Sequence, residues 1–263
     1  MARSRHSKKP PHAAPARYRH ARSDVSRAQK PASQDGDVRV GVFIDWANAY
    51  HRARDQYESF ASSKPPPAYG SFWPTRLGEW LAANQELPER RARRRLVRVA
   101  VFRGIPHGRW DQGGLDAWKR QRAAWEQAAD PRLIVRTHPL RYEFDLCKAQ
   151  DMRCKQRCTL TEEPFVREKG IDVQMAIDVL GQALTNAVDV AVLVTADTDF
   201  LPLVSELENL RREGSGSISV ELTAWQGVGT KLTPPPQVWG GWRHWITPDV
   251  FNTLRDDTDY DIA

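Results

Sequence analysis

Short apolar runs that alternate with stretches of helical spacing constrain the fold of this chain most. Each run is rich in β-branched or aromatic residues, and the stretches between runs are long enough to cross back over a sheet. Strand, helix, strand order implies parallel pairs, so we expect a three-layer α/β domain with a mostly parallel, five-stranded sheet and the first strand central. The predicted strands are residues 38–45, 95–104, 131–140, 190–196 and 217–225.

The apolar run Val190–Val194 ends abruptly, and two aspartates, Asp197 and Asp199, follow it. Aspartate is a poor strand former and is costly to desolvate, so this pair needs a partner. Functional groups of parallel sheets gather where the strands end. Asp45 ends the first predicted strand, and Asp172 lies in the first turn of the helix before residue 190. We therefore expect Asp45, Asp172, Asp197 and Asp199 to form one catalytic and metal-binding cluster.

Four converging carboxylates repel one another unless a cation lies between them. Hard oxygen ligands suit Mg²⁺ or Mn²⁺, and such a site can activate a water and neutralise a phosphoryl oxygen. Each aspartate also has a purely structural interpretation. Asp45 could cap a helix near Ala47, and Asp199 could cap one at Phe200. Asp172 could be only a first-turn residue that the helix dipole stabilises. Their coincidence at strand ends favours the functional interpretation.

Three segments carry a resemblance to a known family. VFIDWANAY, EKGIDVQMAIDVL and VLVTADTDFLPLV, in this order, resemble the motifs of NYN domains in the PIN-like nuclease superfamily, and of its bacterial LabA-like branch in particular. The resemblance covers residues 38–224 and implies a PIN-like, Rossmann-like fold and metal-dependent ribonuclease activity. The chain departs from the family pattern at Thr195 and Ala196, where serine and glycine are usual. The matched motifs imply supporting roles for Asn48, Thr195 and Lys169.

Asn48 would hold a metal-bound water or a substrate phosphate through its neutral amide. Asp178 also recurs in such motifs, but it lies about two-thirds of a turn around the helix from Asp172. The expected core face of this helix is marked by Val173, Ile177, Leu180 and Leu184. Asp178 would therefore either line the cleft or face solvent.

The first 37 residues carry the whole net charge of +6. This segment contains prolines and few large apolar residues, so we expect residues 1–37 to be a disordered basic tail that either attracts RNA or only solubilises the chain. The domain would span residues 38–224, with 139–168 as a loop or insertion. A Trp-rich extension with an acidic end, 225–263, would pack on it. Trp239, Trp242 and Trp245 could stack bases, but burial is favoured.

Basic residues after the second predicted strand are the expected RNA contacts, because that strand end lies closest to the carboxylates. They are Arg103, Arg109, Lys119, Arg120 and Arg122. The arginine-rich run at residues 89–98 could be a phosphate-contacting ridge, but a solvated loop with a charged strand entry is favoured.

Three cysteines, Cys147, Cys154 and Cys158, could bind zinc together with His138, but their spacing fits no standard finger, so free thiols are favoured. An odd number of cysteines makes no disulfide framework and indicates a reducing cytoplasm. No apolar run approaches the length of a membrane span, and no secretory signal is evident, so we expect a cytoplasmic protein without membrane contact.

The leading interpretation is a Mg²⁺- or Mn²⁺-dependent ribonuclease with RNA as its partner. One alternative is an RNA-binding or regulatory module whose carboxylate site is vestigial. Another is a phosphatase or glycosyl transferase that uses the Asp197-Thr198-Asp199 motif to bind its metal. The oligomeric state does not follow from the sequence.

Overall fold

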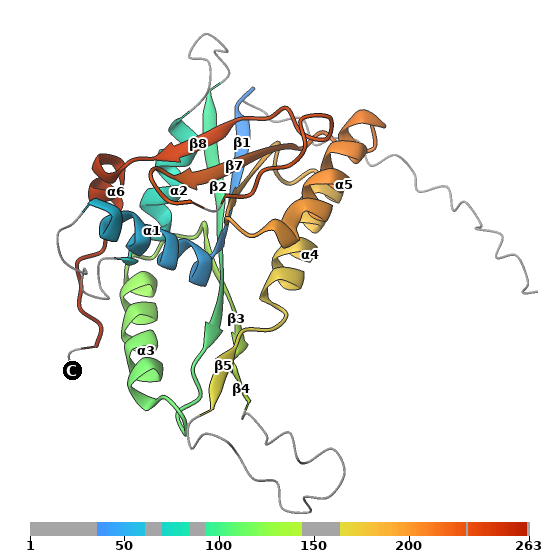
Figure 1. Ribbon diagram of the computed structural model, residues 1–263. Helices are drawn as coiled ribbons and strands as arrows, with labels where there is room; N and C mark the ends of the chain where they lie inside the picture. The colour runs from blue at the N-terminus through green and yellow to red at the C-terminus, as the bar shows by residue number, and fades with distance from the viewer. Residues whose placement is uncertain (1–35, 61–69, 85–92, 144–163, 230, 262–263) are drawn as a thin grey trace, which may run out of the picture. The chain divides into compact units, whose positions relative to one another are not determined.

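Six parallel strands form the centre of the fold in the computed structural model (Figure 1). Their order across the sheet is β3-β2-β1-β6-β7-β8. The structure describes residues 36–60, 70–84, 93–143, 164–229 and 231–261, which belong to one compact unit. The strands are β1 (Val38–Asp45), β2 (Arg94–Ile105), β3 (Leu133–Pro139), β6 (Val190–Val194), β7 (Ser219–Trp225) and β8 (Arg243–Ile246).

The strand order reverses at β1. From β1 the chain moves outward through β2 and β3, and it later returns to add β6, β7 and β8 on the other side. β1 therefore pairs with β2 along one edge and with β6 along the other. Connections that leave in opposite directions open a crevice beyond the carboxyl ends of the two central strands. The predicted parallel sheet with a central first strand is confirmed.

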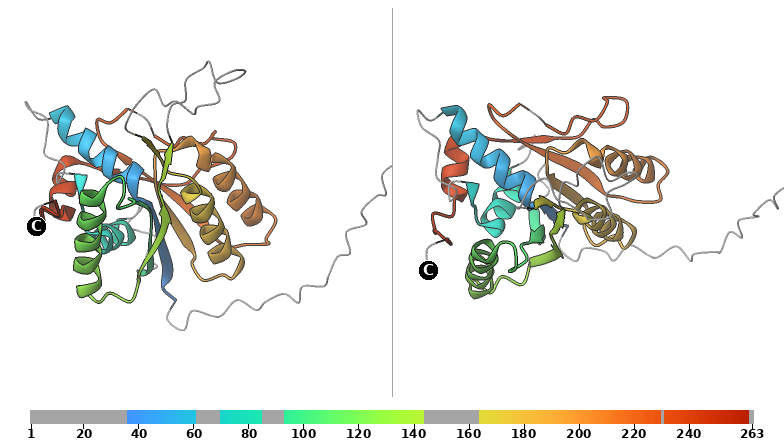
Figure 2. Two further views of the ribbon diagram at one scale, coloured as in Figure 1. Left: turned by 90° about the horizontal axis from the view of Figure 1, so that it is seen from below. Right: turned by 60° about the horizontal axis from the view of Figure 1, so that its bottom comes forward.

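Helices cover both faces of the sheet (Figures 1 and 2). Successive side chains of a strand point to opposite faces. Val40, Val42 and Ile44 pack in a core with α1, α2, α3 and α6, whereas Phe43 packs in a second core with α4 and α5. The predicted three-layer α/β fold is thus confirmed. The helices are α1 (Trp46–Phe60), α2 (Pro74–Ala83), α3 (Gln112–Gln127), α4 (Ile171–Leu184), α5 (Leu201–Arg212) and α6 (Pro248–Leu254).

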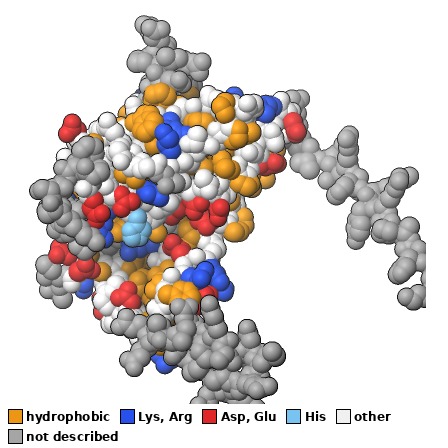
Figure 3. Space-filling view, in the orientation of Figure 1, with side chains coloured by type: hydrophobic (Ala, Val, Ile, Leu, Met, Phe, Trp, Pro, Cys, Tyr) orange, Lys and Arg blue, Asp and Glu red, His pale blue; other side chains and the backbone are white. Residues whose placement is uncertain are grey.

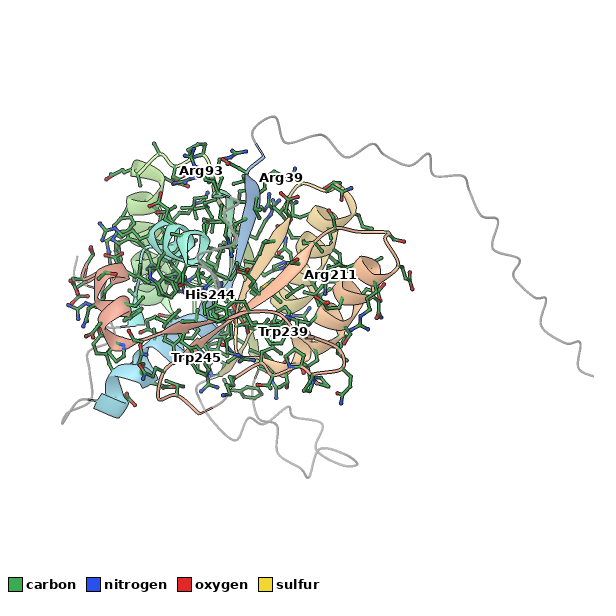
Figure 4. The ribbon with its side chains drawn as sticks, turned by 90° about the horizontal axis from the view of Figure 1, so that it is seen from above. Arg39, Arg93, Arg211, Trp239, His244 and Trp245 are labelled. Carbon is green, nitrogen blue, oxygen red and sulfur yellow. The ribbon has the colours of Figure 1, made fainter. Side chains whose placement is uncertain are left out.

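The sheet has one strand more than the predicted five. β8 pairs with β7 in parallel register from Leu222 opposite Arg243. Periodicity misses β8 because the strand has four residues and half of them are polar. Its side chains alternate: His244 is fully buried, whereas Trp245 is 46% exposed at the edge (Figure 4). The burial expected of Trp245 is therefore wrong, and the region after residue 224 contributes both a strand and α6.

α4 packs through a different face from the one that periodicity predicts. Its buried residues are Ile171, Met175, Val179 and Ala183. Val173, Ile177 and Leu184, which were expected in the core, are exposed instead. Apolar residues lie on more than one side of this helix, so the spacing alone does not select the buried face.

The region between β3 and α4 contains a short antiparallel hairpin of β4 (Arg141–Glu143) and β5 (Phe165–Arg167). Residues 144–163, with all three cysteines, and residues 1–35 of the expected basic tail lie outside the described residues. The zinc alternative, the disorder of the tail and the domain boundaries therefore stay predictions. Among the described helices, none is long and apolar enough to cross a membrane.

Candidate active site

Asp45 lies at the end of β1 and is only 5% exposed. One carboxylate oxygen, Oδ1, accepts a hydrogen bond from the Asn48 backbone N–H at 3.2 Å, and the other, Oδ2, accepts one from the Thr195 hydroxyl at 3.1 Å. Burial raises the pKa of Asp45 to about 7; the Asn48 and Thr195 hydrogen bonds oppose this rise, and the negative charges of Asp172 and Glu168 add to it. The carboxyl is thus firmly held although it is costly to ionise.

The turn after β6 is fixed by the side chain of Asn48, in the first turn of α1, and by that of Thr195, directly after β6. Asn48 Oδ1 accepts the backbone N–H of Ala196 at 2.8 Å, and the Thr195 hydroxyl oxygen accepts the N–H of Asp197 at 3.1 Å. Thr195 is fully buried. Asn48 and Thr195 therefore tie the end of β1 to the turn that carries Asp197.

The helix-cap interpretation applies to two of the four aspartates. Asp45 accepts the N–H of Asn48 in the first turn of α1, as a capping residue does. Asp197, and not Asp199, caps the 3-10 helix Thr198–Phe200, because its Oδ1 accepts the N–H of Asp199 at 2.9 Å. These bonds orient the carboxylates, and they leave other oxygen lone pairs available.

Asp172 completes the group from the first turn of α4. Gly170 precedes this helix with a φ of 86°, a left-handed conformation that glycine adopts without strain. Burial raises the pKa of Asp172, and the nearby charges of Asp197 and Asp199 raise it further. Asp172 therefore lies within electrostatic reach of Asp45, Asp197 and Asp199, which come from two other segments. Figure 3 shows acidic side chains interspersed with basic and apolar ones on the face seen in the orientation of Figure 1.

Glu168 is a site residue that sequence reasoning missed. Its Oε1 accepts the backbone N–H of Gly104, at the end of β2. A Cβ atom at Gly104 would lie only 2.6 Å from that oxygen, so glycine permits the approach. Burial raises the pKa of Glu168, and Asp172 contributes to the rise. The one local signal is its place two residues before Gly170, within the segment read as an insertion.

Two predicted supporting residues form ion pairs outside the four aspartates. The Asp178 carboxylate accepts two hydrogen bonds from Arg98 Nη2, at 2.9 and 2.7 Å, so it joins α4 to β2. Lys169 Nζ donates to Glu143 Oε1 at 3.1 Å, at the end of the β4–β5 hairpin. Both contacts are structural pairings. His138, the suggested fourth zinc ligand, instead contacts the Gln174 side chain.

The predicted RNA-binding residues divide into two groups. Arg103 points inward, with its guanidinium over the rings of Trp46 and Trp118 at 5.5 and 4.6 Å. Arg120 donates from Nε to the backbone carbonyl of Tyr260 at 2.7 Å. The others are engaged at the surface: Arg109 over Trp110, Lys119 with Asp116, and Arg122 with Glu126.

The carboxyl oxygens present suit a hydrated Mg²⁺ or Mn²⁺, which binds through one or two carboxylates and keeps several waters. Within the described ranges, no group of three or more His, Cys, Asp or Glu side chains is arranged to hold an ion directly. A fit therefore requires that water completes the coordination. The donors that the described residues provide at this site are hard oxygens, which favour these ions over zinc.

Comparison with known proteins places residues 39–226 within the family model described as the NYN domain. No curated protein matches the chain. Among solved structures, a similar one is the crystal structure of VPA0982, a protein of unknown function from Vibrio parahaemolyticus. It has a TM-score of 0.40 and 16% sequence identity, over 82% of this chain and 96% of that chain.

Proposed function

The chain belongs to the NYN domain family, and we propose that it is a metal-dependent ribonuclease whose active site is the group of four aspartates at the switch point. NYN domains are generally nucleases, which supports hydrolysis of a nucleic-acid phosphodiester. The finer assignment, RNA cleavage with Mg²⁺ or Mn²⁺, rests on the chemistry of these side chains.

The observation that carries the proposal is that the cluster of Asp45, Asp172, Asp197 and Asp199 lacks compensating charge. None of the four forms an ion pair with a described Lys or Arg, although other aspartates of the domain, such as Asp178 and Asp189, do so. Burial and mutual repulsion raise the pKa of Asp45 and of Asp172. Such a cluster destabilises the metal-free fold, and a cation bound in the working state would explain why it is present.

The four aspartates would hold the ion, which when bound neutralises charge on the phosphoryl group and lowers the pKa of the attacking water. The protein's own part is to position these groups. Thr195 donates its hydroxyl hydrogen to Asp45 while its oxygen accepts the N–H of Asp197, and Asn48 fixes the turn between them. Fixed geometry lowers the cost of reorganisation during the reaction.

RNA is the proposed substrate, and the cytoplasm is the proposed location. Arg103, at the end of β2, and Arg120, on α3, are the leading candidates for RNA contacts, because a guanidinium can bind phosphate in bidentate fashion. The cationic segment at residues 1–37 would add affinity that falls steeply with salt.

The test compares cleavage of end-labelled RNA and of DNA of the same sequence by the purified full chain, with Mn²⁺, with Mg²⁺ and with EDTA. Asp197→Asn removes one carboxylate at nearly constant size. Glu213→Gln is the matched control, because it removes one exposed carboxylate after the end of α5, where the chain turns back toward the start of β7. Wild type and Glu213→Gln should cleave RNA equally with Mn²⁺ and not with EDTA. Asp197→Asn should be slower by roughly a thousandfold or more.

Three results would contradict the proposal, and they point to different alternatives. RNA binding without cleavage under any divalent ion would favour a binding module with a vestigial site. Hydrolysis of small phosphate esters without RNA cleavage would favour a phosphatase. Cleavage by Asp197→Asn at the wild-type rate would show that the reaction takes place elsewhere.

A further inference from the structure

An open cavity of about 410 Å³ lies between α1, the end of β2, α3 and residues 258–261. Two of its lining residues connect it to the aspartates. Trp46 directly follows Asp45 in the sequence. The charge of Glu168 raises the pKa of Asp45, and the charge of Asp172 raises the pKa of Glu168. The volume falls within the range of cavities that bind small ligands. The described residues thus form a ligand-sized space that adjoins the proposed active site.

Arg103 places a positive charge without an ion-pair partner among the described residues on the wall of this cavity. Its guanidinium is held over the rings of Trp46 and Trp118 and bonds to the Gln121 side chain. No described carboxylate lies within ion-pair distance, although Glu168 acts on it from farther away. Burial lowers the pKa of Arg103 to about 10, so the guanidinium is still charged at neutral pH. A partly buried cation without an ion-pair partner favours an anionic ligand, and arginine matches the geometry of phosphate.

The other walls suit a nucleobase. Tyr50 and His51 line the cavity, and bases stack on aromatic rings with little dependence on sequence. Trp46 also lines it, but this side chain is 4% exposed and packs against Phe72 and Trp125. The Gln121 side chain is 4% exposed and uses its Oε1 for Arg103, which leaves its amide N–H groups as donors on the same wall. The guanidinium suits the phosphate of a nucleotide, and the aromatic rings and the amide donors suit its base.

The acidic end of the chain forms one side of this cavity. Thr258, Asp259, Tyr260 and Asp261 all line it. The segment is anchored where the Tyr260 hydroxyl donates to Asp256 Oδ2 at 2.7 Å and where Arg120 donates to the Tyr260 carbonyl. The exposed carboxylates of Asp259 and Asp261 therefore lie at a cavity that also contains Arg103. They would repel a phosphate that approaches this side.

We propose that this cavity binds one nucleotide of the RNA next to the bond that is cut, with a phosphate on Arg103 and the base against Tyr50 and His51. The inference rests on the proposed ribonuclease function for its biological meaning. Binding itself needs no catalysis, however, and it can be measured in EDTA. The acidic chain end then acts as a gate, because its charges weaken binding unless the RNA displaces them.

The test is isothermal titration calorimetry of the full chain in EDTA with UMP, AMP, the corresponding nucleosides and inorganic phosphate. The monophosphates should bind at least about tenfold more tightly than the nucleosides, and inorganic phosphate alone should bind weakly. Arg103→Gln and His51→Ala should each weaken UMP binding, Arg103→Gln by about tenfold or more. Asp259→Asn combined with Asp261→Asn should tighten it about threefold or more. Arg95→Gln, at an exposed arginine near the start of β2, is the matched control and should change nothing.

Arg103 is packed between two indoles, so Arg103→Gln could fail to fold; the exposed His51 and the acidic pair then keep the test decisive. Equal UMP binding by wild type, His51→Ala and the double aspartate variant would overturn the inference. RNA cleavage by a protein that binds no mononucleotide would overturn it and leave the ribonuclease function standing. UMP binding that follows the predicted variant pattern, in a protein that never cleaves RNA, would support the cavity and refute the ribonuclease.

Discussion

Replacement of Asp45 by asparagine should stabilise the metal-free protein, and the gain should depend on pH. Asp45 is 5% exposed, and its burial together with neighbouring carboxylates raises its pKa from 3.8 to about 7. In the unfolded chain the group ionises near pH 4, so the folded state pays an electrostatic penalty once pH exceeds that value. The penalty grows between pH 4 and 7 and is constant above, because the folded carboxyl is then ionised as well.

The size of this effect follows from the two pKa values. A pKa difference of about three units corresponds to about 4 kcal/mol at pH 8, and to about 1.5 kcal/mol at pH 5. Asparagine carries no charge, so it escapes the penalty at both values. It keeps one acceptor oxygen but presents an N–H₂ group to one of the two donors, Asn48 N–H or the Thr195 hydroxyl, which costs about 1 to 2 kcal/mol at any pH.

The assay is urea unfolding of wild type and Asp45→Asn in EDTA at pH 8 and at pH 5, with equal m-values as a condition for the comparison. The variant should be more stable at pH 8 by about 2 to 3 kcal/mol, and this advantage should shrink by about 2.5 kcal/mol at pH 5. The pH dependence of the difference reports the charge of Asp45 and its coupling to Asp172 and Glu168, since the remaining titrating groups are shared. A stability difference that is equal at the two pH values, or a variant that is less stable at pH 8, would refute the reasoning.

Three further predictions separate structural from functional residues. Asp178→Asn should lower the free energy of unfolding by about 2 to 4 kcal/mol, because it leaves Arg98 partly unpaired. At temperatures where the variant is folded, its RNA cleavage rate should be unchanged. A loss of cleavage without a loss of stability would contradict this. Glu221→Gln breaks the buried pair with Arg94, so it should lower the free energy of unfolding by about 3 to 5 kcal/mol in urea titrations, and an unchanged midpoint would argue against that pair. Ile177→Gln, at an exposed apolar position of α4, should change the free energy of unfolding by no more than about 0.5 kcal/mol. A large loss of stability would mean that this face is covered in solution.

The sheet and the placement of its aspartates could be predicted because their signals are local. The runs that form β1 and β6 are apolar up to the point where each strand ends, and parallel topology then puts their carboxyl ends at one edge. Asp45 and Asp197 follow from these two facts alone. Tertiary information was not needed to expect a charged crevice there.

Features that depend on distant contacts could not be predicted. Glu168 joins the site only through the backbone N–H of Gly104, which is 64 residues away in the sequence. β8 is too short to show a period, and it forms because β7 offers an unpaired edge. Arg103 was expected as an RNA contact, but its position over the rings of two tryptophans from α1 and α3 was not foreseen. In each case a neighbour that is remote in sequence decides the environment.

The central claim is that the aspartates at the switch point hold a divalent cation, and Mn²⁺ binding tests it most directly. The electron paramagnetic resonance signal of free Mn²⁺ decreases as the ion binds, so a titration of the full chain reports affinity and stoichiometry without any substrate. Wild type and Glu213→Gln should share a tight Mn²⁺ site, and Asp45→Asn and Asp197→Asn should each weaken it by about tenfold or more. Mn²⁺ binding of equal strength in all four proteins would contradict the claim.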